Sequence, residues 1–216
     1  MNPVTITQLE SYIQLSLSEA NIFDEFIKRC QLYYDRPAHS ISEIKDAQST
    51  KVKGDVFEHF AYMYFSRVKK WQVWFLKDLP KEIRDKLKLA KVDLGIDLIA
   101  QDQDKFYAIQ AKYRKQNTRT KTVLGWKQLS TFYGIVSKTG PWKKHIVFTN
   151  ADYIRHVGAK TILDKSICLG TMRGIKRHEW EEMMGFVGHK LTETTTRLTS
   201  EQVREKRLQL LDKIEK

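Results

Sequence analysis

The chain has 216 residues, enough for one α/β domain with extensions and a sizeable hydrophobic core. Hydrophobic residues make up 41% of the sequence and charged residues 30%, a composition that excludes a disordered chain. No apolar run approaches the roughly 18 residues of a membrane span. The first twenty residues lack the basic start of a secretory signal. Two cysteines without a CxxC pair, Cys30 and Cys168, argue against a zinc knuckle or a disulfide scaffold, so we expect an intracellular protein that is not secreted.

The net charge is +12, and most of it lies in one segment. Residues 105–160 contain 12 Lys and Arg and a single acid, Asp152, which gives a local net charge of +11. Aromatic residues are interleaved with these cations: Tyr113, Trp126, Phe132, Tyr133 and Trp142. Such a positive field favours a polyanion, and nucleic acid is the expected partner. The alternative is a basic surface that only keeps the protein soluble.

Hydrophobic periodicity and breaker residues predict an alternation of helices and strands. In chain order the expected elements are helices at 6–15, 19–34 and 51–68, a strand at 71–76, a short charged helix at 79–87, strands at 94–100 and 106–111 around a turn at 101–104, a helix at 123–136, strands at 144–149 and 167–169, a helix at 178–184, a linker at 192–196 and a last charged helix from 200. This order describes an α/β fold with helices around a mixed sheet.

Three expected domains follow from the same reading. Residues 1–50 form a helical N-terminal extension or subdomain, and residues 51–190 form the core. Residues 191–216 form a linker and a C-terminal helix, which we expect to lead to a further domain.

Asp97 interrupts an apolar run from Leu94 to Ala100. A carboxylate in a strand of the buried type is costly unless it is paired or bound to a metal. The alternative is an aspartate that faces water from an edge strand. The apolar residues on both sides weaken that alternative.

Gln110 and Lys112 are the second break in the pattern. The period of two puts them on the same strand face as Phe106 and Ala108. If the hairpin turns at residues 103–104, Asp97 lies opposite Gln110, and the three polar side chains converge at one end of the hairpin. The alternative is a strand that runs out into solvent.

Glu58 is the third break, at the border of the apolar stripe of the helix predicted at 51–68. At ~100° per residue, it lies only about 20° around the helix from Phe65. The alternative is an ion pair with a lysine such as Lys69. Together, two acids and an amide oxygen suit a hard divalent cation such as Mg²⁺, and Lys112 could stabilise charge on a phosphodiester.

These residues resemble the PD-(D/E)XK nuclease superfamily, in its Mrr-like branch of restriction endonucleases. The matching segments are Gly54-Asp55-Val56-Phe57-Glu58, Gly95-Ile96-Asp97 and Gln110-Ala111-Lys112. The segment 73–80 also resembles nuclease domains fused to helicases, as in single-polypeptide type I restriction enzymes and in viral or plasmid helicase fusions. The resemblance covers residues 53–150 and implies a restriction-endonuclease-like mixed β-sheet flanked by helices.

The resemblance also implies roles for individual residues. Asp97 is the central metal ligand, and Gln110 takes the place of the second acidic ligand. The backbone carbonyl of Ala111 is a further ligand, and Glu58 binds the metal directly or through water. Lys112 is the motif lysine. The implied cofactor is Mg²⁺, with Mn²⁺ as a substitute.

We therefore expect a Mg²⁺-dependent DNA endonuclease, the nuclease domain of a restriction or helicase-coupled DNA-processing enzyme, with no membrane partner. A fused or associated helicase is one expected partner, and a homodimer is another, since one active site cuts one strand. The alternative is an inactive nuclease fold that serves as a nucleic-acid-binding or interaction module of a larger motor enzyme. The residues expected to contact DNA are Arg114, Lys115, Arg119, Lys121, Lys127, Gln128, Lys143 and Lys144.

Overall fold

The computed structural model describes residues 6–34, 50–90, 95–116, 119–155 and 165–185. The chain divides into two units, Met1–Phe186 and Val187–Lys216. The second unit lies outside the described residues, and so do the predicted linker at 192–196 and the last predicted helix. No helix in the described ranges is long and apolar enough to cross a membrane. The domain boundaries at residues 50 and 190 stay predictions.

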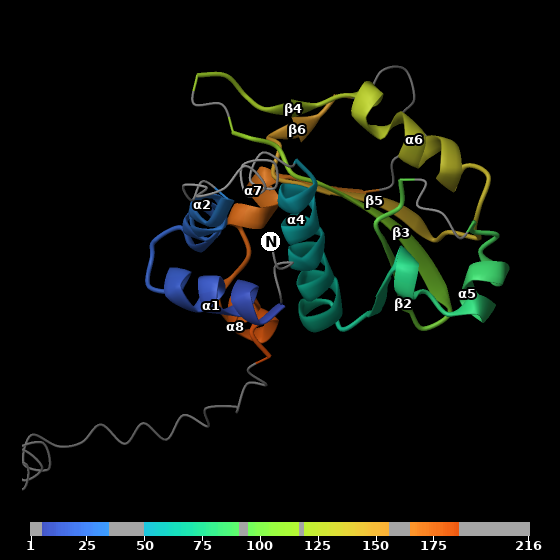
Figure 1. Cartoon of the computed structure of the whole chain (residues 1–216), viewed down its shortest axis with the longest axis horizontal. Coiled ribbons are helices and arrows are strands. Elements are labelled where there is room, and N and C mark those ends of the chain that lie inside the picture. Colours follow the sequence, from blue (N-terminus) through green and yellow to red (C-terminus); the bar gives the residue numbers. More distant parts are fainter. Residues whose placement is uncertain (1–5, 35–49, 91–94, 117–118, 156–164, 186–216) are drawn as a thin grey trace, which may run out of the picture. The chain divides into compact units, whose positions relative to one another are not determined.

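A five-stranded mixed sheet organises the first unit (Figure 1). The strands lie in the order β1-β2-β3-β5-β7. They are β1 (Gln72–Phe75), β2 (Leu98–Asp102), β3 (Lys105–Lys112), β5 (Lys144–Thr149) and β7 (Lys165–Ile167). β1, β2 and β3 pair antiparallel, whereas β5 runs parallel to both β3 and β7. The predicted mixed sheet is therefore confirmed.

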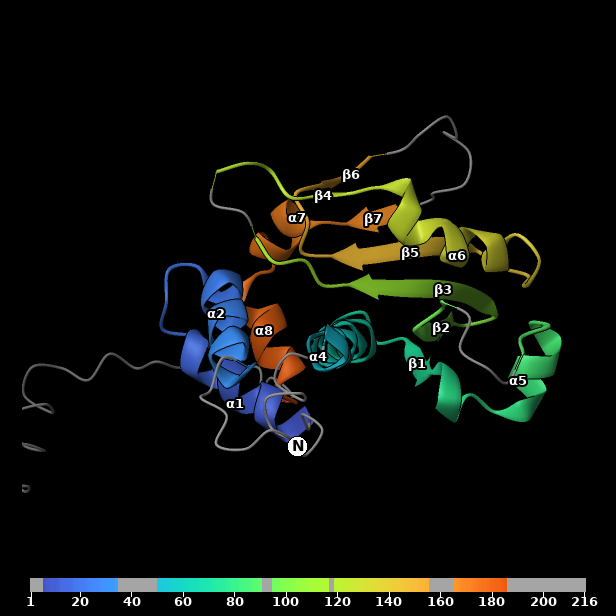
Figure 2. The same ribbon diagram turned by 45° about the horizontal axis from the view of Figure 1, so that its top comes forward.

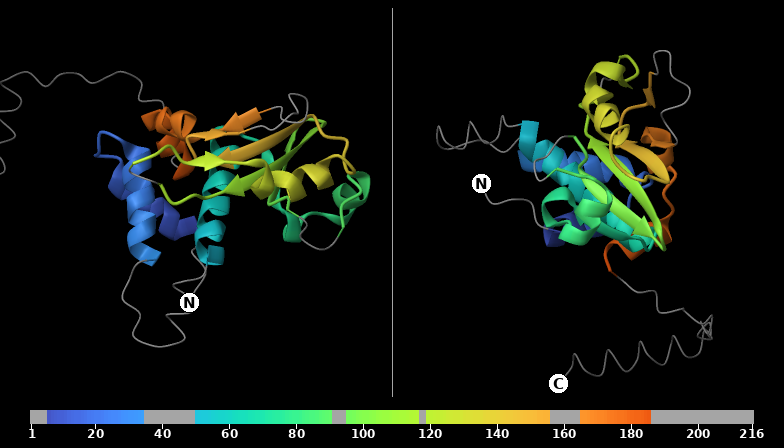
Figure 3. Two further views of the ribbon diagram at one scale, coloured as in Figure 1. Left: turned by 90° about the horizontal axis from the view of Figure 1, so that it is seen from above. Right: turned by 90° about the vertical axis from the view of Figure 1, so that its right-hand side faces the viewer.

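One face of the sheet packs against α4 (Thr50–Met63) and the π-helical turn η1 (Tyr64–Val68) that continues it. The aromatic stripe of α4 makes the contact, because the rings of Phe57 and Phe60 lie 5.3 and 5.5 Å from that of Phe148 on β5. The helices α1 (Ile6–Ser16), α2 (Ile22–Tyr34), α7 (Leu169–Arg173) and α8 (Arg177–Met183) extend this layer (Figures 2 and 3).

The N-terminal helices share this core with the sheet. The ring of Phe26 in α2 lies 4.9 Å from Phe60, and Trp180 of α8 stacks on Phe60 at 5.5 Å. Buried residues of α1 and α2, from Leu9 to Cys30, therefore belong to the same hydrophobic cluster as the strands.

The opposite face of the sheet is covered by α6 (Trp126–Val136) and by the region of α5 (Lys81–Lys86). Phe106 and Ala108 of β3 join the cluster on this side, whereas Tyr107 and Ile109 join the cluster under α4. This alternation confirms the predicted period of two along β3. Because β3 and β5 are parallel, their connection has to cross over the sheet, and α6 makes that crossover.

Several predicted boundaries differ from the structure. Val123–Leu124 form a short strand, β4, which pairs in parallel with β6 (Tyr153–Ile154), and α6 starts only at Trp126. Gly125 separates them with an extended backbone at φ −103° and ψ 175°. The strand predicted at 167–169 ends at Ile167, and Leu169 already belongs to α7.

The predicted strand at 94–100 also begins later than expected. Gly95 has a φ of +105°, which interrupts the extended chain, and β2 starts at Leu98. Asp97 consequently lies just before the strand rather than in its middle, and Leu94 lies outside the described residues.

Candidate active site

Asp97 lies opposite Gln110 at the end of the β2–β3 hairpin, as the spacing predicts. Leu98 pairs with Ile109, and the backbone N–H of Asp97 continues the ladder by donating to the carbonyl of Ile109 at 3.0 Å. The Oδ2 atom of Asp97 accepts a hydrogen bond from the backbone N–H of Ala111 at 2.7 Å and another from Nε2 of Gln110. The carboxylate is therefore oriented by two donors from β3.

The turn of the hairpin fixes this register. Asp102 pairs with Lys105, so only Gln103 and Asp104 form the turn. Gln103 has a φ of +57°, a left-handed conformation that such tight turns require. With the turn fixed, the antiparallel register brings Asp97 to Gln110 without further information from the rest of the fold.

Gly95 brings the chain close to α6 just before Asp97. A Cβ atom at this position would lie 3.3 Å from a side-chain carbon of Thr131 and 3.4 Å from the backbone nitrogen of Phe132. The left-handed φ and the close approach both favour glycine here. The segment that carries Asp97 is thus held between β3 and α6.

Gln110 is buried, with 2% of its surface exposed. A neutral amide can lie against the Asp97 carboxylate and donate to it, whereas a second carboxylate would repel it. Because Nε2 is directed to Asp97, Oε1 is the side-chain atom of Gln110 that can bind a cation.

Glu58 and Lys112 line one cleft of about 430 Å³ at the end of β3. Glu58 projects into it from α4, and Ala111 links the cleft to the Asp97 carboxylate through its backbone N–H. The residues that line the cleft are Gly54, Glu58, Ala111, Lys112, Tyr113, Arg114 and Lys115. Lys69, the alternative partner of Glu58, lies instead 3.7 Å from Glu179 of α8.

Two buried polar residues at the end of β5 hold the backbone behind the cleft, and the sequence reading missed them. The hydroxyl of Thr149 donates to the carbonyl of Lys112 at 2.6 Å. The side-chain amide of Asn150 accepts from the N–H of Arg114 at 2.6 Å and donates to its carbonyl at 2.7 Å. Both residues directly follow the apolar run 146–148, and this break in pattern is the signal that could have revealed them.

The residues expected to bind DNA fall into separate groups. Arg114 and Lys115 line the cleft. Arg119 and Lys121 are exposed in the segment that leads to β4, and Lys127 is exposed in the first turn of α6.

Three other residues of that set are placed differently. The Oε1 of Gln128 accepts from the N–H of Gly125 at 2.9 Å and caps α6. Lys144 pairs with Tyr107, and the N–H of Lys143 donates to the carbonyl of Phe106 at 2.7 Å. The structure therefore does not bring Lys143 and Lys144 to the cleft, since they lie at the opposite end of β5.

The donor atoms of the predicted site fit a hard cation. Within the described ranges, no three His, Cys, Asp or Glu residues form a group that could hold a metal. The predicted set contains only two acids, Asp97 and Glu58, and completes them with an amide oxygen and a backbone carbonyl. Oxygen donors of these kinds are those that Mg²⁺ and Mn²⁺ accept.

The two thiols have a different character. Burial raises the pKa of both Cys30 and Cys168 above the ordinary value of a thiol. A metal such as zinc binds the thiolate form. Both cysteines therefore favour the neutral thiol at neutral pH.

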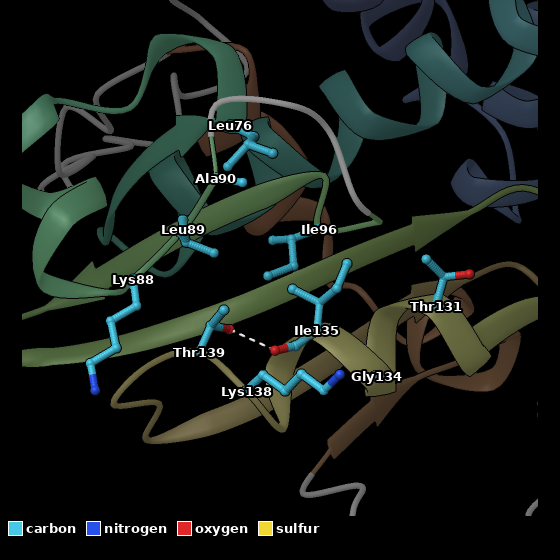
Figure 4. Close-up of a pocket in the computed structure, with 10 residues that line it drawn as sticks. All are labelled: Leu76, Lys88, Leu89, Ala90, Ile96, Thr131, Gly134, Ile135, Lys138 and Thr139. Carbon is cyan, nitrogen blue, oxygen red and sulfur yellow. Dashed lines mark hydrogen bonds between the residues drawn. The ribbon is translucent and has the colours of Figure 1, made fainter.

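A second cavity of about 460 Å³ lies between α6 and residues 88–90 (Figure 4). Its lining is mainly apolar, with Lys88 and Lys138 among the residues around it. Ile96, the neighbour of Asp97, contributes to the wall, but none of the predicted site residues does.

The chain matches a known protein family. A family model described as restriction endonuclease matches residues 63–183, more than half of the chain. The matched range contains Asp97, Gln110, Ala111 and Lys112, and Glu58 precedes it. No curated protein and no solved structure matches the chain.

Proposed function

The chain belongs to the restriction endonuclease family, as its resemblance to Mrr-like PD-(D/E)XK nucleases implied, and from this we propose that it is a divalent-metal-dependent endonuclease that hydrolyses phosphodiester bonds of DNA. One observation supports the proposal most directly. Asp97 and Gln110 lie opposite each other at the end of a hairpin, two residues from Lys112, and the carboxylate of Asp97 is oriented by hydrogen bonds from the Gln110 side chain and the backbone N–H of Ala111.

The metal-binding role falls to Asp97, Oε1 of Gln110, the backbone carbonyl of Ala111 and Glu58. A bound Mg²⁺, or Mn²⁺ in its place, would neutralise a phosphodiester oxygen and lower the pKa of a coordinated water. Hydrogen bonds to the second oxygen of a ligand carboxylate orient it. The N–H of Ala111 does this for Asp97.

Lys112 lies in the cleft, where its ammonium group can stabilise the negative charge that develops on the phosphate during hydrolysis. Its backbone is fixed by pairing with Thr149 and by the hydrogen bond from the Thr149 hydroxyl. A fixed backbone limits the positions that the ammonium group can reach, which favours catalysis by a preorganised charge.

Besides Lys112, the cations that line the cleft are Arg114 and Lys115, so we propose that these two hold the DNA backbone at the site. Phosphate contacts of this kind position the duplex without reading its sequence. To reach Lys144 as well, the DNA would have to extend the length of β5, about 17 Å at the usual rise per residue.

The test is metal-dependent cleavage of supercoiled plasmid by the purified chain, with Mg²⁺, Mn²⁺ or EDTA, beside the variant Asp97→Asn. We expect nicking with either metal, none with EDTA and none by the variant. Asp102→Asn, at the turn end of the same hairpin, is the matched control and is expected to cleave normally.

The failure of this test has a defined meaning. If the protein shifts DNA on a gel but does not cleave it with either metal, the chain is the inactive nucleic-acid-binding module and not a nuclease. If Asp97→Asn cleaves as well as the unchanged chain, the proposed ligand set is wrong.

The product of the reaction tests the proposed partners. A lone site gives nicked circles, whereas paired cuts by a homodimer give linear plasmid, with a rate that rises with protein concentration. The association with a helicase rests on the resemblance of residues 73–80 alone.

A further inference from the structure

Two large aromatic side chains of the basic segment are exposed, one on the first residue of α6 and the other in β6. β6 pairs with β4, which ends two residues before α6 (Figure 1). Trp126 and Tyr153 each have 41% of their surface exposed. In the part of the chain that the structure describes, Leu15 of α1 is the other large hydrophobic residue that is exposed, at 53%, and it lies outside the basic segment.

The two aromatic residues come from adjoining backbone. Tyr153 pairs with Val123, three residues before Trp126, and the N–H of Arg155 donates to the carbonyl of Leu124 at 2.8 Å. Three residues of extended chain span about 10 Å, which places both aromatic residues within reach of one strand of nucleic acid.

Neighbouring residues hold the ring of Trp126 and the backbone beside Tyr153. The ring of Trp126 stacks on that of the buried Tyr133, with centroids 5.0 Å apart and planes 19° from parallel. Beside Tyr153, Asp152 exchanges two hydrogen bonds with Thr122, from its backbone N–H at 2.8 Å and to its carboxylate at 2.7 Å. A ring held by a neighbour, such as that of Trp126, loses less conformational entropy when a ligand binds.

The surroundings of these rings are positively charged. Exposed cations lie on both sides of them in the sequence, namely Arg119, Lys121, Lys127 and Arg155. The single acid of the segment, Asp152, accepts the backbone N–H of Thr122.

We propose that Trp126, Tyr153 and these cations form a surface that binds an unpaired strand of nucleic acid, with bases stacked on the two rings. The proposal deepens the proposed function, because it assigns the enzyme a DNA substrate with a single-stranded stretch. In a duplex the base faces are covered by neighbouring pairs, so a surface ring can stack on a base only where the strand is unpaired. Basic grooves that contain aromatic rings bind single strands with little sequence preference.

The binding experiment uses the full chain in EDTA, so that no cleavage occurs, titrated with a thymidine oligonucleotide and followed by tryptophan fluorescence. Trp126 is the one exposed tryptophan of the described residues, and stacking on it should quench its emission. The duplex of the same length should bind with much less quenching. The affinities of the variants are measured by the fluorescence anisotropy of a labelled oligonucleotide, because the Trp126 variants lack the quenched ring. Trp126→Ala and Tyr153→Ala should each weaken single-strand binding by about 5-fold to 150-fold, the range known for base–aromatic stacking.

Control variants separate stacking from a loss of structure. Leu15→Ala removes an exposed apolar side chain away from the basic segment and should bind normally, and Trp126→Phe and Tyr153→Phe should retain most of the affinity. The proposal is overturned if both alanine variants bind within twofold of the unchanged chain, or if the phenylalanine variants lose as much as the alanine variants. It is also overturned if the duplex quenches as strongly as the single strand.

This binding test is independent of the plasmid cleavage test. If the binding test shows no stacking but the chain still cleaves plasmid with metal, the preference for single-stranded DNA is wrong and the nuclease proposal stands. If the rings stack on single strands but the chain does not cleave plasmid, the single-strand surface is supported and the nuclease proposal is wrong.

Discussion

Asn150 holds the backbone of Arg114 with both polar atoms of its side-chain amide, at 2.6 and 2.7 Å. This pair continues the β3–β5 ladder beyond its last backbone pair, Lys112 and Thr149. The buried side chain of Asn150 therefore replaces the next backbone pair of the sheet, and it does so beside the cleft, which Arg114 lines.

Asn150→Asp should destabilise the protein. The change keeps the shape but removes the donor to the Arg114 carbonyl, and an unsatisfied buried group costs about 1–3 kcal/mol. Urea unfolding measures the loss. The same change at Asn21, an exposed residue that precedes α2, keeps the acceptor for the N–H of Asp24 and removes a donor to the Asp24 carboxylate, and because both groups lie in water it should cost less than about 1 kcal/mol. Equal losses at both positions would contradict the structural role of Asn150.

Lys112→Ala should abolish DNA cleavage and leave most of the DNA binding intact. The reason is that Lys112 is assigned to the charge on the reacting phosphate, while many other cations hold the strand. Cleavage assays and gel shifts with one DNA fragment measure the two effects. Lys105→Ala, at the other end of β3, is the control and should retain both activities. Cleavage that survives Lys112→Ala would remove this mechanism.

Gln110→Glu should make stability more dependent on metal. The new carboxylate would face Asp97 in place of an amide donor, so the two charges repel without a cation and attract one more strongly. Thermal unfolding in EDTA and in Mg²⁺ should therefore show a larger gain from Mg²⁺ than the unchanged chain shows. Gln101→Glu, near the turn of the hairpin, is the control. The same gain in all three proteins would argue against a metal at Gln110.

The salt dependence of DNA binding should distinguish the two groups of lysines. Lys115→Gln, in the cleft, should weaken binding and reduce the slope of log affinity against log salt by roughly 1. Lys144→Gln removes the same charge at the far end of β5 and should have a smaller effect. Titrations between ~50 and ~200 mM salt measure both slopes. A flat salt dependence of the unchanged chain would contradict phosphate-led binding altogether.

Tyr133→Phe should stabilise the protein. The Tyr133 hydroxyl is buried, and within the described residues it has no hydrogen-bond partner, so its removal should add about 1 kcal/mol to the free energy of unfolding. Tyr153→Phe, which removes an exposed hydroxyl, should change the stability little. Denaturant unfolding at neutral pH compares the two.

The benefit of Tyr133→Phe should grow at alkaline pH. Burial raises the pKa of the Tyr133 phenol from 10.0 to about 12. Between these values the unfolded chain loses the proton before the folded one does, so the tyrosine protein loses stability as the pH rises from 10 towards 12. The phenylalanine variant lacks this loss. A difference that stays constant between pH 8 and pH 11 would contradict it.

The sequence by itself determined the pairing of Asp97 with Gln110 and the faces of β3. Both follow from local rules, a two-residue turn and a period of two, which act within twenty residues of chain. The predicted starts of the helix α6 and the strand β2 were too early, because Gly125 and Gly95 change the backbone direction at single residues and shift both elements along the chain. The metal ligands and the DNA contacts assigned from the sequence stay predictions.

Only the tertiary structure decided which residues from distant parts of the chain lie beside the β2–β3 hairpin. Glu58 reaches the cleft of Lys112 because α4 packs its aromatic stripe on the sheet, more than fifty residues before the strand that it covers. The parallel register of β3 and β5 brings Asn150 to Arg114 and sends Lys144 to the opposite end of the sheet. Pairing between strands that are far apart in sequence depends on the packing of the whole core, and local hydrophobic periodicity carries no information about it.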